Sequence, residues 1–230
     1  GVGVARDAKE GMAWLEKAAT LGHAGAQYEL GLAYQAGSGV NVDEHRAFIW
    51  MLRAARQGRL SAMVAVSRAY ERGIGIEANP DESVRWAMRA VDLGVDSKTM
   101  LLKAANAYAA GVLVERNVPR AIKLFEQVAA DGDANAMLSL GKLYGDEDAG
   151  GDSAKAVAWF KKAEESGKTD ALMELGRAYA GGVGVALDER RAFEYFMRAA
   201  RAGSVEGMRE LGTALATGFG VNPNPILAVD

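Results

Sequence analysis

Cysteine is absent from this 230-residue sequence, and proline and histidine are scarce, with four and two copies. The lack of cysteine excludes disulfides, thiolate metal sites and cysteine nucleophiles. No apolar run approaches the roughly 20 residues that a membrane-spanning helix needs, so no membrane insertion is expected within this segment. With 27 basic and 30 acidic residues the formal charge is −3, which gives no reason to expect nucleic acid as a partner.

What the chain has in abundance is glycine, with 28 copies, and many of these glycines belong to a repeated pattern. A bulky anchor residue recurs every 35 to 38 residues, at Trp14, Trp50, Trp86, Leu124, Trp159 and Tyr195. Seven residues before each anchor stands Asp or Asn: Asp7, Asp43, Asn79, Asn117, Asp152 and Asp188. Eight residues after each anchor stands glycine: Gly22, Gly58, Gly94, Gly132, Gly167 and Gly203. An Asp or Asn N-cap and a left-handed glycine bound a helix, so each anchor is predicted to lie in a helix, called here a B helix.

A second motif falls between consecutive B helices and predicts another helix, called here an A helix. Its tyrosine stands at Tyr34, Tyr70, Tyr108, Tyr144 and Tyr179, with Leu215 in the sixth copy. Three residues earlier a small residue recurs, at Gly31, Ser67, Ala105, Gly141, Gly176 and Gly212. Glycine or serine inside a helix lowers helix propensity, so we expect the small residue to permit close approach of a neighbouring helix. A Gly-x-Gly-Val turn then leads into the next B helix.

These motifs predict about twelve short amphipathic helices that bury their apolar faces only by stacking on their neighbours. We expect a single array of about six repeats over residues 1–221, incomplete at both ends, as in a segment cut from a longer protein. Residues 222–230 are predicted to be a tail or the start of a truncated next helix. Two turns depart from the pattern: residues 111–114 read Gly-Val-Leu-Val, and residues 145–152 form an acidic loop.

The combined pattern resembles the Sel-one-like repeat (SLR) family, which is related to the tetratricopeptide repeats. It reads A-x-x-x-L-G-x-x-Y-x-x-G-x-G-V, then D-x-x-x-A-x-x-W and A-A-x-x-G, and residues 171–203 follow it almost position by position. The resemblance implies an all-α, right-handed solenoid of antiparallel helix pairs that serves as a non-catalytic scaffold for a protein partner. It also implies a bacterial periplasmic or envelope location, with roles in signalling, cell polarity or exopolysaccharide assembly.

Several features that suggest chemistry have plainer interpretations. The Gly-x-Gly turns follow helices rather than strands, so they are interpreted as helix caps and not as phosphate loops. The acidic loop lacks the calcium-binding spacing, and His23 and His45 match no catalytic or metal motif, so both are interpreted as surface residues. The tryptophans occupy the anchor position and are expected in the core. No catalytic residue, cofactor or metal is predicted.

One surface remains as a candidate binding site. In tetratricopeptide-like arrays the concave face is lined by the A helix, at the residue after the small one and four residues before that. The first row is then Leu32, Arg68, Asn106, Lys142, Arg177 and Thr213. The second row is Tyr28, Val64, Leu102, Leu138, Met173 and Arg209. Our partner-binding candidates are Tyr28, Arg68, Asn106, Leu138, Lys142, Met173, Arg177 and Arg209.

Basic residues beside an apolar stripe favour an acidic peptide or helix as the ligand. The alternatives are an acidic polysaccharide, such as an exopolysaccharide or peptidoglycan, bound in the same groove, or an ordinary solvated helix face.

Overall fold

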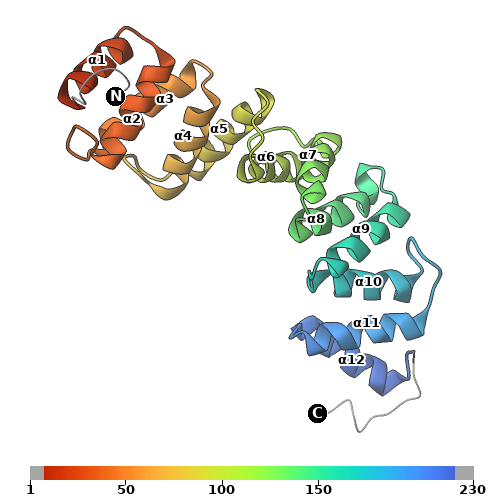
Figure 1. Cartoon of the computed structure of the whole chain (residues 1–230). Coiled ribbons are helices and arrows are strands. Elements are labelled where there is room, and N and C mark those ends of the chain that lie inside the picture. The colour runs from red at the N-terminus through yellow and green to blue at the C-terminus, as the bar shows by residue number, and fades with distance from the viewer. Residues whose placement is uncertain (1–7, 221–230) are drawn as a thin grey trace. The chain divides into compact units, whose positions relative to one another are not determined.

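The computed structural model describes residues 8–220, and within them the chain is helical with no strand. Figure 1 shows the helices in chain order. They are α1 (Ala8–Thr20), α2 (Ala24–Ala36), α3 (Glu44–Arg56), α4 (Leu60–Arg72), α5 (Pro80–Asp92), α6 (Lys98–Ala110), α7 (Val118–Ala130), α8 (Ala134–Tyr144), the short 3₁₀ helix η1 (Glu147–Ala149), α9 (Ser153–Glu165), α10 (Asp170–Gly181), α11 (Glu189–Arg201) and α12 (Val205–Thr217). The odd-numbered α-helices are the predicted B helices and the even-numbered ones are the predicted A helices. The prediction of about twelve helices is confirmed.

The helix ends follow the capping residues. Five of the predicted N-caps accept a hydrogen bond from the backbone N–H three residues on: Asp43, Asn79, Asn117, Asp152 and Asp188. The sixth, Asp7, lies outside the described residues. All six predicted glycines after the B helices have positive φ, between 83° and 96°. The boundaries of the B helices are therefore local properties of the sequence.

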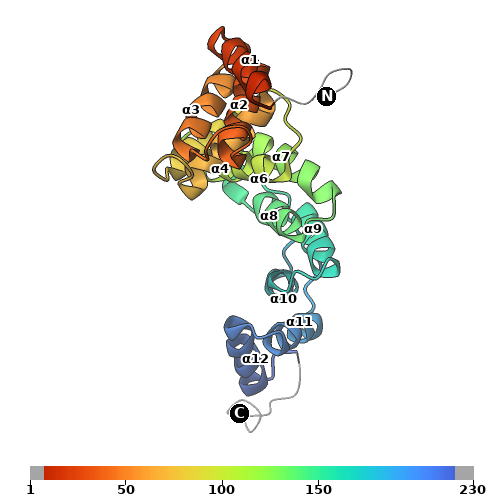
Figure 2. The ribbon, with the colours of Figure 1, turned by 60° about the vertical axis from the view of Figure 1, so that its left-hand side comes forward.

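The chain forms two compact units, Gly1–Glu115 with α1 to α6 and Arg116–Asp230 with α7 to α12. Within each unit the main packing is between helices adjacent in sequence, which lie side by side in Figures 1 and 2. Short connections make such neighbours antiparallel, and each helix completes the core of the one before it. The predicted class, an all-α solenoid of helix pairs, is confirmed. The predicted tail, residues 222–230, lies outside the described residues.

The small position of the A helices allows the following B helix to come close. A Cβ at Gly31 would lie 2.7 Å from Cγ of Met51 on α3. At Gly141 and Gly176 it would overlap the rings of Phe160 and Phe196, on α9 and α11. The structure confirms the predicted close approach at these three positions, and it shows that the residue just after the anchor fills the space.

The anchors are less uniformly buried than the sequence predicts. Trp86 and Leu124 are buried, whereas Trp50, Trp159 and Tyr195 are half-buried. The expectation that Trp14 lies in the core is wrong, because its side chain is 62% exposed. Trp14 lies on α1, which packs mainly on α2, whereas α3 packs on helices at both sides.

The aromatic anchors share a partner that the sequence analysis missed. A basic residue three positions after each one places its charged group 4.0 to 5.5 Å from the ring centroid. The pairs are Trp14–Lys17, Trp50–Arg53, Trp86–Arg89, Trp159–Lys162 and Tyr195–Arg198. This spacing places both side chains on one helix face, so each basic group lies near its ring at a cation–π distance.

Two residues of the first unit depart from the repeat in ways that the structure explains. Leu113 replaces the second glycine of the turn and has a φ of 67°, the only positive φ among the described non-glycine residues. Ser67 occupies the small position of α4, and its hydroxyl donates to the backbone carbonyl of Ser83 at 2.8 Å. Lys103 donates to the Ser83 hydroxyl at 2.7 Å and pairs with Glu71 at 3.0 Å. These partners satisfy the two buried serine hydroxyls.

Candidate partner-binding surface

The first row of the A helices lies on the surface, as the sequence analysis predicted. All six of its residues are exposed: Leu32, Arg68, Asn106, Lys142, Arg177 and Thr213. The small residue just before the first-row position is buried in five of these six helices, so the next position, about 100° further around the helix, turns outward. The first row therefore follows from the same local pattern that determines the packing.

The second row is only partly accessible. Tyr28, Val64 and Leu102 are half-buried and Arg209 is exposed. The expectation that Leu138 and Met173 line an open groove is wrong, because they are 7% and 5% exposed. Met173 belongs to the core cluster with Phe196, since α10 packs against both α9 and α11. We call the two rows without these two residues the A face.

In the first unit the A face contains a small pocket. Its volume is about 120 Å³, and it is lined by residues of α2, α3 and α4 together with Ile74. Tyr28 and Leu32 contribute from α2 and Arg68 from α4, so residues of both rows meet there. The guanidinium carbon of Arg59 lies 4.9 Å from the centroid of the Tyr28 ring. Tyr28 thus contacts a cation as well as lining the pocket.

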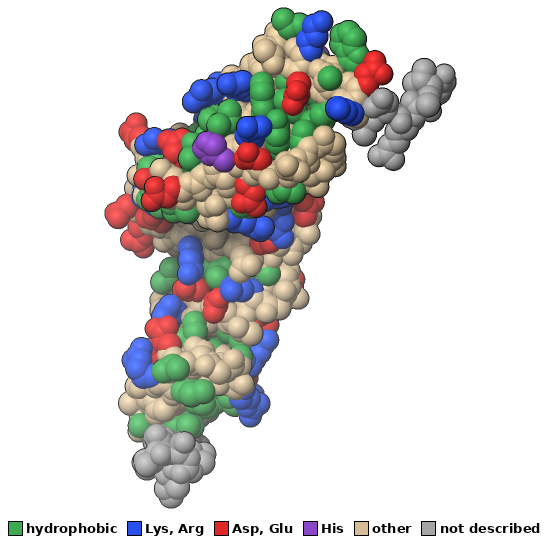
Figure 3. Space-filling model, turned by 90° about the vertical axis from the view of Figure 1, so that its left-hand side faces the viewer, with side chains coloured by type: hydrophobic (Ala, Val, Ile, Leu, Met, Phe, Trp, Pro, Cys, Tyr) green, Lys and Arg blue, Asp and Glu red, His purple; other side chains and the backbone are tan. Residues whose placement is uncertain are grey.

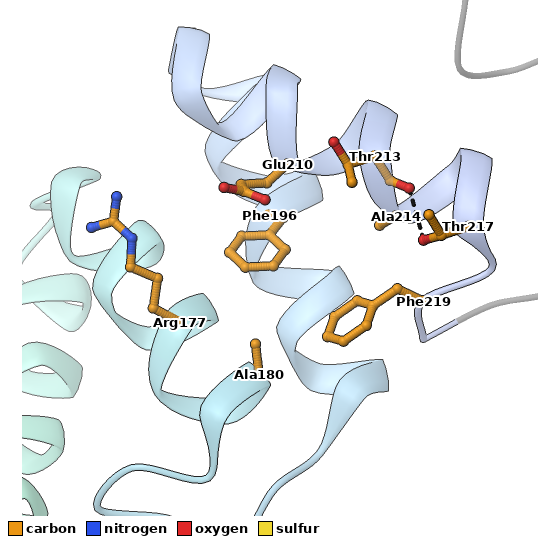
Figure 4. A pocket seen from close by; sticks show the side chains of 8 residues that line it. All are labelled: Arg177, Ala180, Phe196, Glu210, Thr213, Ala214, Thr217 and Phe219. Atoms are coloured by element: carbon orange, nitrogen blue, oxygen red, sulfur yellow. Dashed lines mark hydrogen bonds between the residues drawn. The ribbon is translucent and has the colours of Figure 1, made fainter.

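The second unit has two larger pockets on the A face, and Arg177 lines both. One of about 330 Å³ is lined by Lys142 of α8 and Arg177 of α10, with Phe160 and Val157 of α9 among its apolar residues. The other, of about 350 Å³, is shown in Figure 4. It lies between α10, α11 and α12, with Arg177 on one side and Thr213 on the other.

Apolar groups form the floor of the pocket in Figure 4. The rings of Phe196 and Phe219 lie between α10 and α12, and Ala180 and Ala214 complete the apolar lining. The rim is polar, because Arg177, Glu210 and Thr213 stand around it. An apolar floor with a few polar groups at the edge is the usual composition of a site that receives a side chain of a ligand.

The charges of the A face are mixed rather than uniformly basic. Arg177 pairs with Glu174 at 3.3 Å and with Glu206, and Arg209 pairs with Glu210. Partial burial lowers the pKa of Arg177, but the hydrogen bond to Glu206 and the two carboxylate charges outweigh it and raise the pKa. Basic and acidic side chains are also interspersed over the face of the molecule shown in Figure 3.

Arg68 and Lys142 differ from the other basic residues of the A face. Both are exposed, and neither makes an ion pair with another described residue. Their charges are therefore available to a ligand, one in each unit.

Other chemistry has little support among residues 8–220. No group of three or more His, Asp or Glu side chains there could hold a metal ion. His23 is exposed and its Nδ1 caps α2 by accepting from Ala26 N at 3.1 Å, and exposed His45 bonds the carbonyl of Gly75 at 2.9 Å. In the same part of the chain, every helix is too short or too polar to cross a membrane.

Stacked helix pairs of about 36 residues with a pocketed A face define an α-solenoid of the tetratricopeptide-like class. The chain belongs to the Sel1 repeat family. Seven segments match the Sel1 repeat and together span almost all of the sequence: 1–23, 24–58, 60–95, 101–133, 134–168, 169–204 and 205–230. The predicted resemblance is thus confirmed.

Solved structures support the assignment. The protective antigen c5321 of uropathogenic Escherichia coli strains, which displays an SLR fold, is 28% identical, with a TM-score of 0.64. The match covers 97% of this chain and 48% of that one, so this chain spans about half the length of that protein. A Sel1 repeat protein from Oxalobacter formigenes is 26% identical with a TM-score of 0.61, over 96% of this chain and 88% of that one. No curated protein matches the sequence significantly.

Sel1 repeats typically form non-catalytic scaffolds for protein–protein interaction. The family therefore gives the general kind of function, and the particular surface and partner have to be argued from the residues of this chain.

Proposed function

We propose that this protein is a scaffold that binds a peptide or helix of a partner protein on its A face. The observation that carries the proposal is the conjunction of exposed first-row residues with pockets that they line in each unit. A helix presents anchors at i, i+3, i+4 and i+7, and apolar pockets with polar rims accept such anchors.

The partner has an acidic edge and an apolar edge. The acidic edge is expected opposite Arg68 where a partner binds the first unit, or opposite Lys142 where it binds the second, because both charges are unpaired among the described residues. The apolar edge suits the pocket floor formed by Phe196 and Phe219. Arg177 already has two carboxylate partners, so it helps to form the walls of the pockets but adds little net positive charge to them.

Two double variants test the proposal on a partner captured by photo-crosslinking and then purified. Arg68→Glu/Lys142→Glu changes the A face in both units. The control, Arg56→Glu/Lys123→Glu, reverses one exposed basic residue on a B helix of each unit. We expect the A-face variant to weaken binding at least tenfold, the control to change it less than threefold, and added salt to weaken the wild-type complex.

Equal affinities of the two variants would refute the A face as the binding site. Capture of an acidic polysaccharide instead of a protein would replace the protein scaffold with carbohydrate binding. A protein is favoured, because the A face carries only one aromatic side chain, Tyr28, that could stack on a sugar ring, and all four tryptophans lie on B helices.

We also propose that the protein works in a bacterial cell envelope or periplasm. Support comes from the family resemblance and from the similar E. coli protein, which is described as a protective antigen. Fractionation of the source cells with an antibody against this chain tests the location. Recovery in the cytoplasmic fraction would contradict it.

A further inference from the structure

The tyrosine at the C-terminal end of an A helix has a recurring electrostatic setting. In the first unit the Tyr34 hydroxyl donates to Glu16 of α1 at 3.4 Å and accepts from Nη1 of Arg46, on α3, at 3.5 Å. The carboxylate stands 18 residues before the tyrosine, on the preceding B helix, and the cation follows on the next one. The phenol thus bridges an anion and a cation.

The second unit repeats this arrangement at Tyr144. Its hydroxyl donates to Glu126 of α7 at 3.3 Å, again 18 residues earlier. Lys155 of α9 supplies the cation, with Nζ 5.4 Å from the ring centroid. Burial and the negative charge of Glu126 raise the pKa of Tyr144, as expected for a phenol beside a carboxylate.

At Tyr179 the carboxylate is replaced by a cation. The residue 18 positions earlier is Lys161, whose Nζ lies 5.8 Å from the centroid of the Tyr179 ring. On the other side Arg191 Nη1 donates to the Tyr179 hydroxyl at 3.3 Å. Burial raises the pKa of Tyr179, but the hydrogen bond from Arg191 and the positive charges of Lys161 and Arg191 outweigh it, so the pKa is lowered. The two cations thus make this setting electropositive, opposite to the one at Tyr144.

A pocket of about 310 Å³ opens at this place in the second unit. It is lined by Lys161, Tyr179, Arg191, Glu194, Tyr195 and Arg198. The Tyr195 ring stacks on that of Tyr179, with centroids 5.6 Å apart and planes 12° apart, and so forms an ordered wall. None of these residues lines the A-face pockets.

The carboxylates near the pocket leave one cation without a partner. Asp188 pairs with Nε of Arg191 at 3.3 Å, Glu164 pairs with Arg198, and Glu194 lies 3.5 Å from Nε of Arg190, beyond the lining. Lys161 is half-buried and has no carboxylate within 4.0 Å among the described residues.

We propose that this pocket is a carboxylate-binding site that takes the side chain of a glutamate from a partner protein. The ligand supplies from outside the carboxylate that Glu16 and Glu126 supply from within at the equivalent tyrosines. Lys161 and Arg191 balance the charge of the ligand carboxylate. The Tyr179 hydroxyl accepts a hydrogen bond from Arg191 and donates one to an oxygen of that carboxylate. A glutamate is favoured because that side chain already occupies this position in two repeats of the same chain.

The test uses the whole chain and two capped pentapeptides, acetyl-Gly-Gly-Glu-Gly-Gly-amide and its glutamine analogue, titrated by NMR. We expect the glutamate peptide to shift the resonances of the pocket residues and the glutamine peptide to bind at least tenfold more weakly. Lys161→Glu places an internal carboxylate in the site and should weaken the glutamate peptide at least tenfold. Lys161→Met, which removes only the charge, should weaken it several-fold, and the control Lys123→Glu on α7 should leave it unchanged.

A second readout reports directly on the tyrosine. The pKa of Tyr179 is obtained by subtracting the ultraviolet absorbance titration curve of Tyr179→Phe from that of the wild type. Saturating glutamate peptide should raise this pKa, because a bound anion opposes ionisation of the phenol. Equal binding of the two peptides, or full affinity in folded Lys161→Glu and Lys161→Met, would overturn the site. Binding of glucuronate in the absence of any peptide binding would overturn the assignment to a protein ligand.

Discussion

Replacing Gly176 with alanine tests the packing of the A and B helices most directly. In an exposed helix interior, glycine to alanine stabilises by about 1 kcal/mol, because alanine loses less backbone entropy on folding. At Gly176 a Cβ would lie 2.7 Å from Cδ1 of Phe196, closer still to Cε1, and 3.2 Å from Cζ. Phe196 is only 5% exposed and packs in the core cluster with Met173, so displacing its ring disturbs that packing.

The expected result is a net loss of stability. Overpacking costs about 1–3 kcal/mol, and with contacts this short we expect about 2–3 kcal/mol. After the helix-propensity gain of about 1 kcal/mol, Gly176→Ala should be roughly 1–2 kcal/mol less stable. At 2–4 °C per kcal/mol for a chain of this size, the melting temperature should fall by about 2–8 °C. Gly176→Leu, with three more carbons to place, should lose more. Thermal and urea unfolding followed by circular dichroism measure the change.

Two controls separate packing from helix propensity. Gly11 lies in α1 with nothing within 4 Å of a Cβ, so Gly11→Ala should stabilise its unit by about 1 kcal/mol. Adding Phe196→Leu to Gly176→Ala removes the ring atoms in the way, so the double variant should lose less than the sum of the single losses. A Gly176→Ala variant as stable as the wild type would refute the close-approach reasoning.

Three further predictions concern single side chains. Leu113→Gly should be more stable than Leu113→Ala by about 1 kcal/mol in urea unfolding, because only glycine adopts the φ of 67° without strain. The pKa of Asp152 is lowered, first by the backbone N–H of Lys155 and then by its ammonium. Its ionised form therefore stabilises the fold at neutral pH, and this contribution is lost as the pH falls below about 4. The free energies of unfolding of the wild type and Asp152→Asn should therefore converge as the pH is lowered from about 7 to about 3. Lys103→Met should cost about 1 kcal/mol, because it removes the hydrogen bond to Ser83 and the ion pair with Glu71.

Each of these predictions has an outcome that contradicts it. Equal stability of the two Leu113 variants would mean that the turn relaxes at no cost. A pH-independent difference between wild type and Asp152→Asn would show that the carboxylate is not ionised preferentially in the folded state. For Lys103 the control is Lys123→Met on the exposed side of α7, and equal effects of the two substitutions would remove the role assigned to the serine network.

Much of the fold was predictable because its determinants are local in sequence. An Asp such as Asp43 caps a helix through a backbone N–H three residues away, and a glycine such as Gly58 ends it by taking positive φ. The small residue Gly176 orients its helix, and the exposure of Arg177 follows one position later from helix geometry. The repeats made these capping and small residues recognisable, since each recurs with nearly the same spacing in successive copies.

The accessibility and charge of individual sites depended on the tertiary structure. The same row position is half-buried at Val64 and buried at Met173, because its exposure depends on how closely the flanking helices pack there. The ion pair of Arg177 with Glu206 and the setting of Tyr179 between Lys161 and Arg191 join residues from different helices. Sequence alone therefore determined the helices, their ends and the outward-facing first row, whose causes lie within a few residues. Burial, ion pairing and the pockets were decided only in the folded chain, because they arise where side chains of different helices meet.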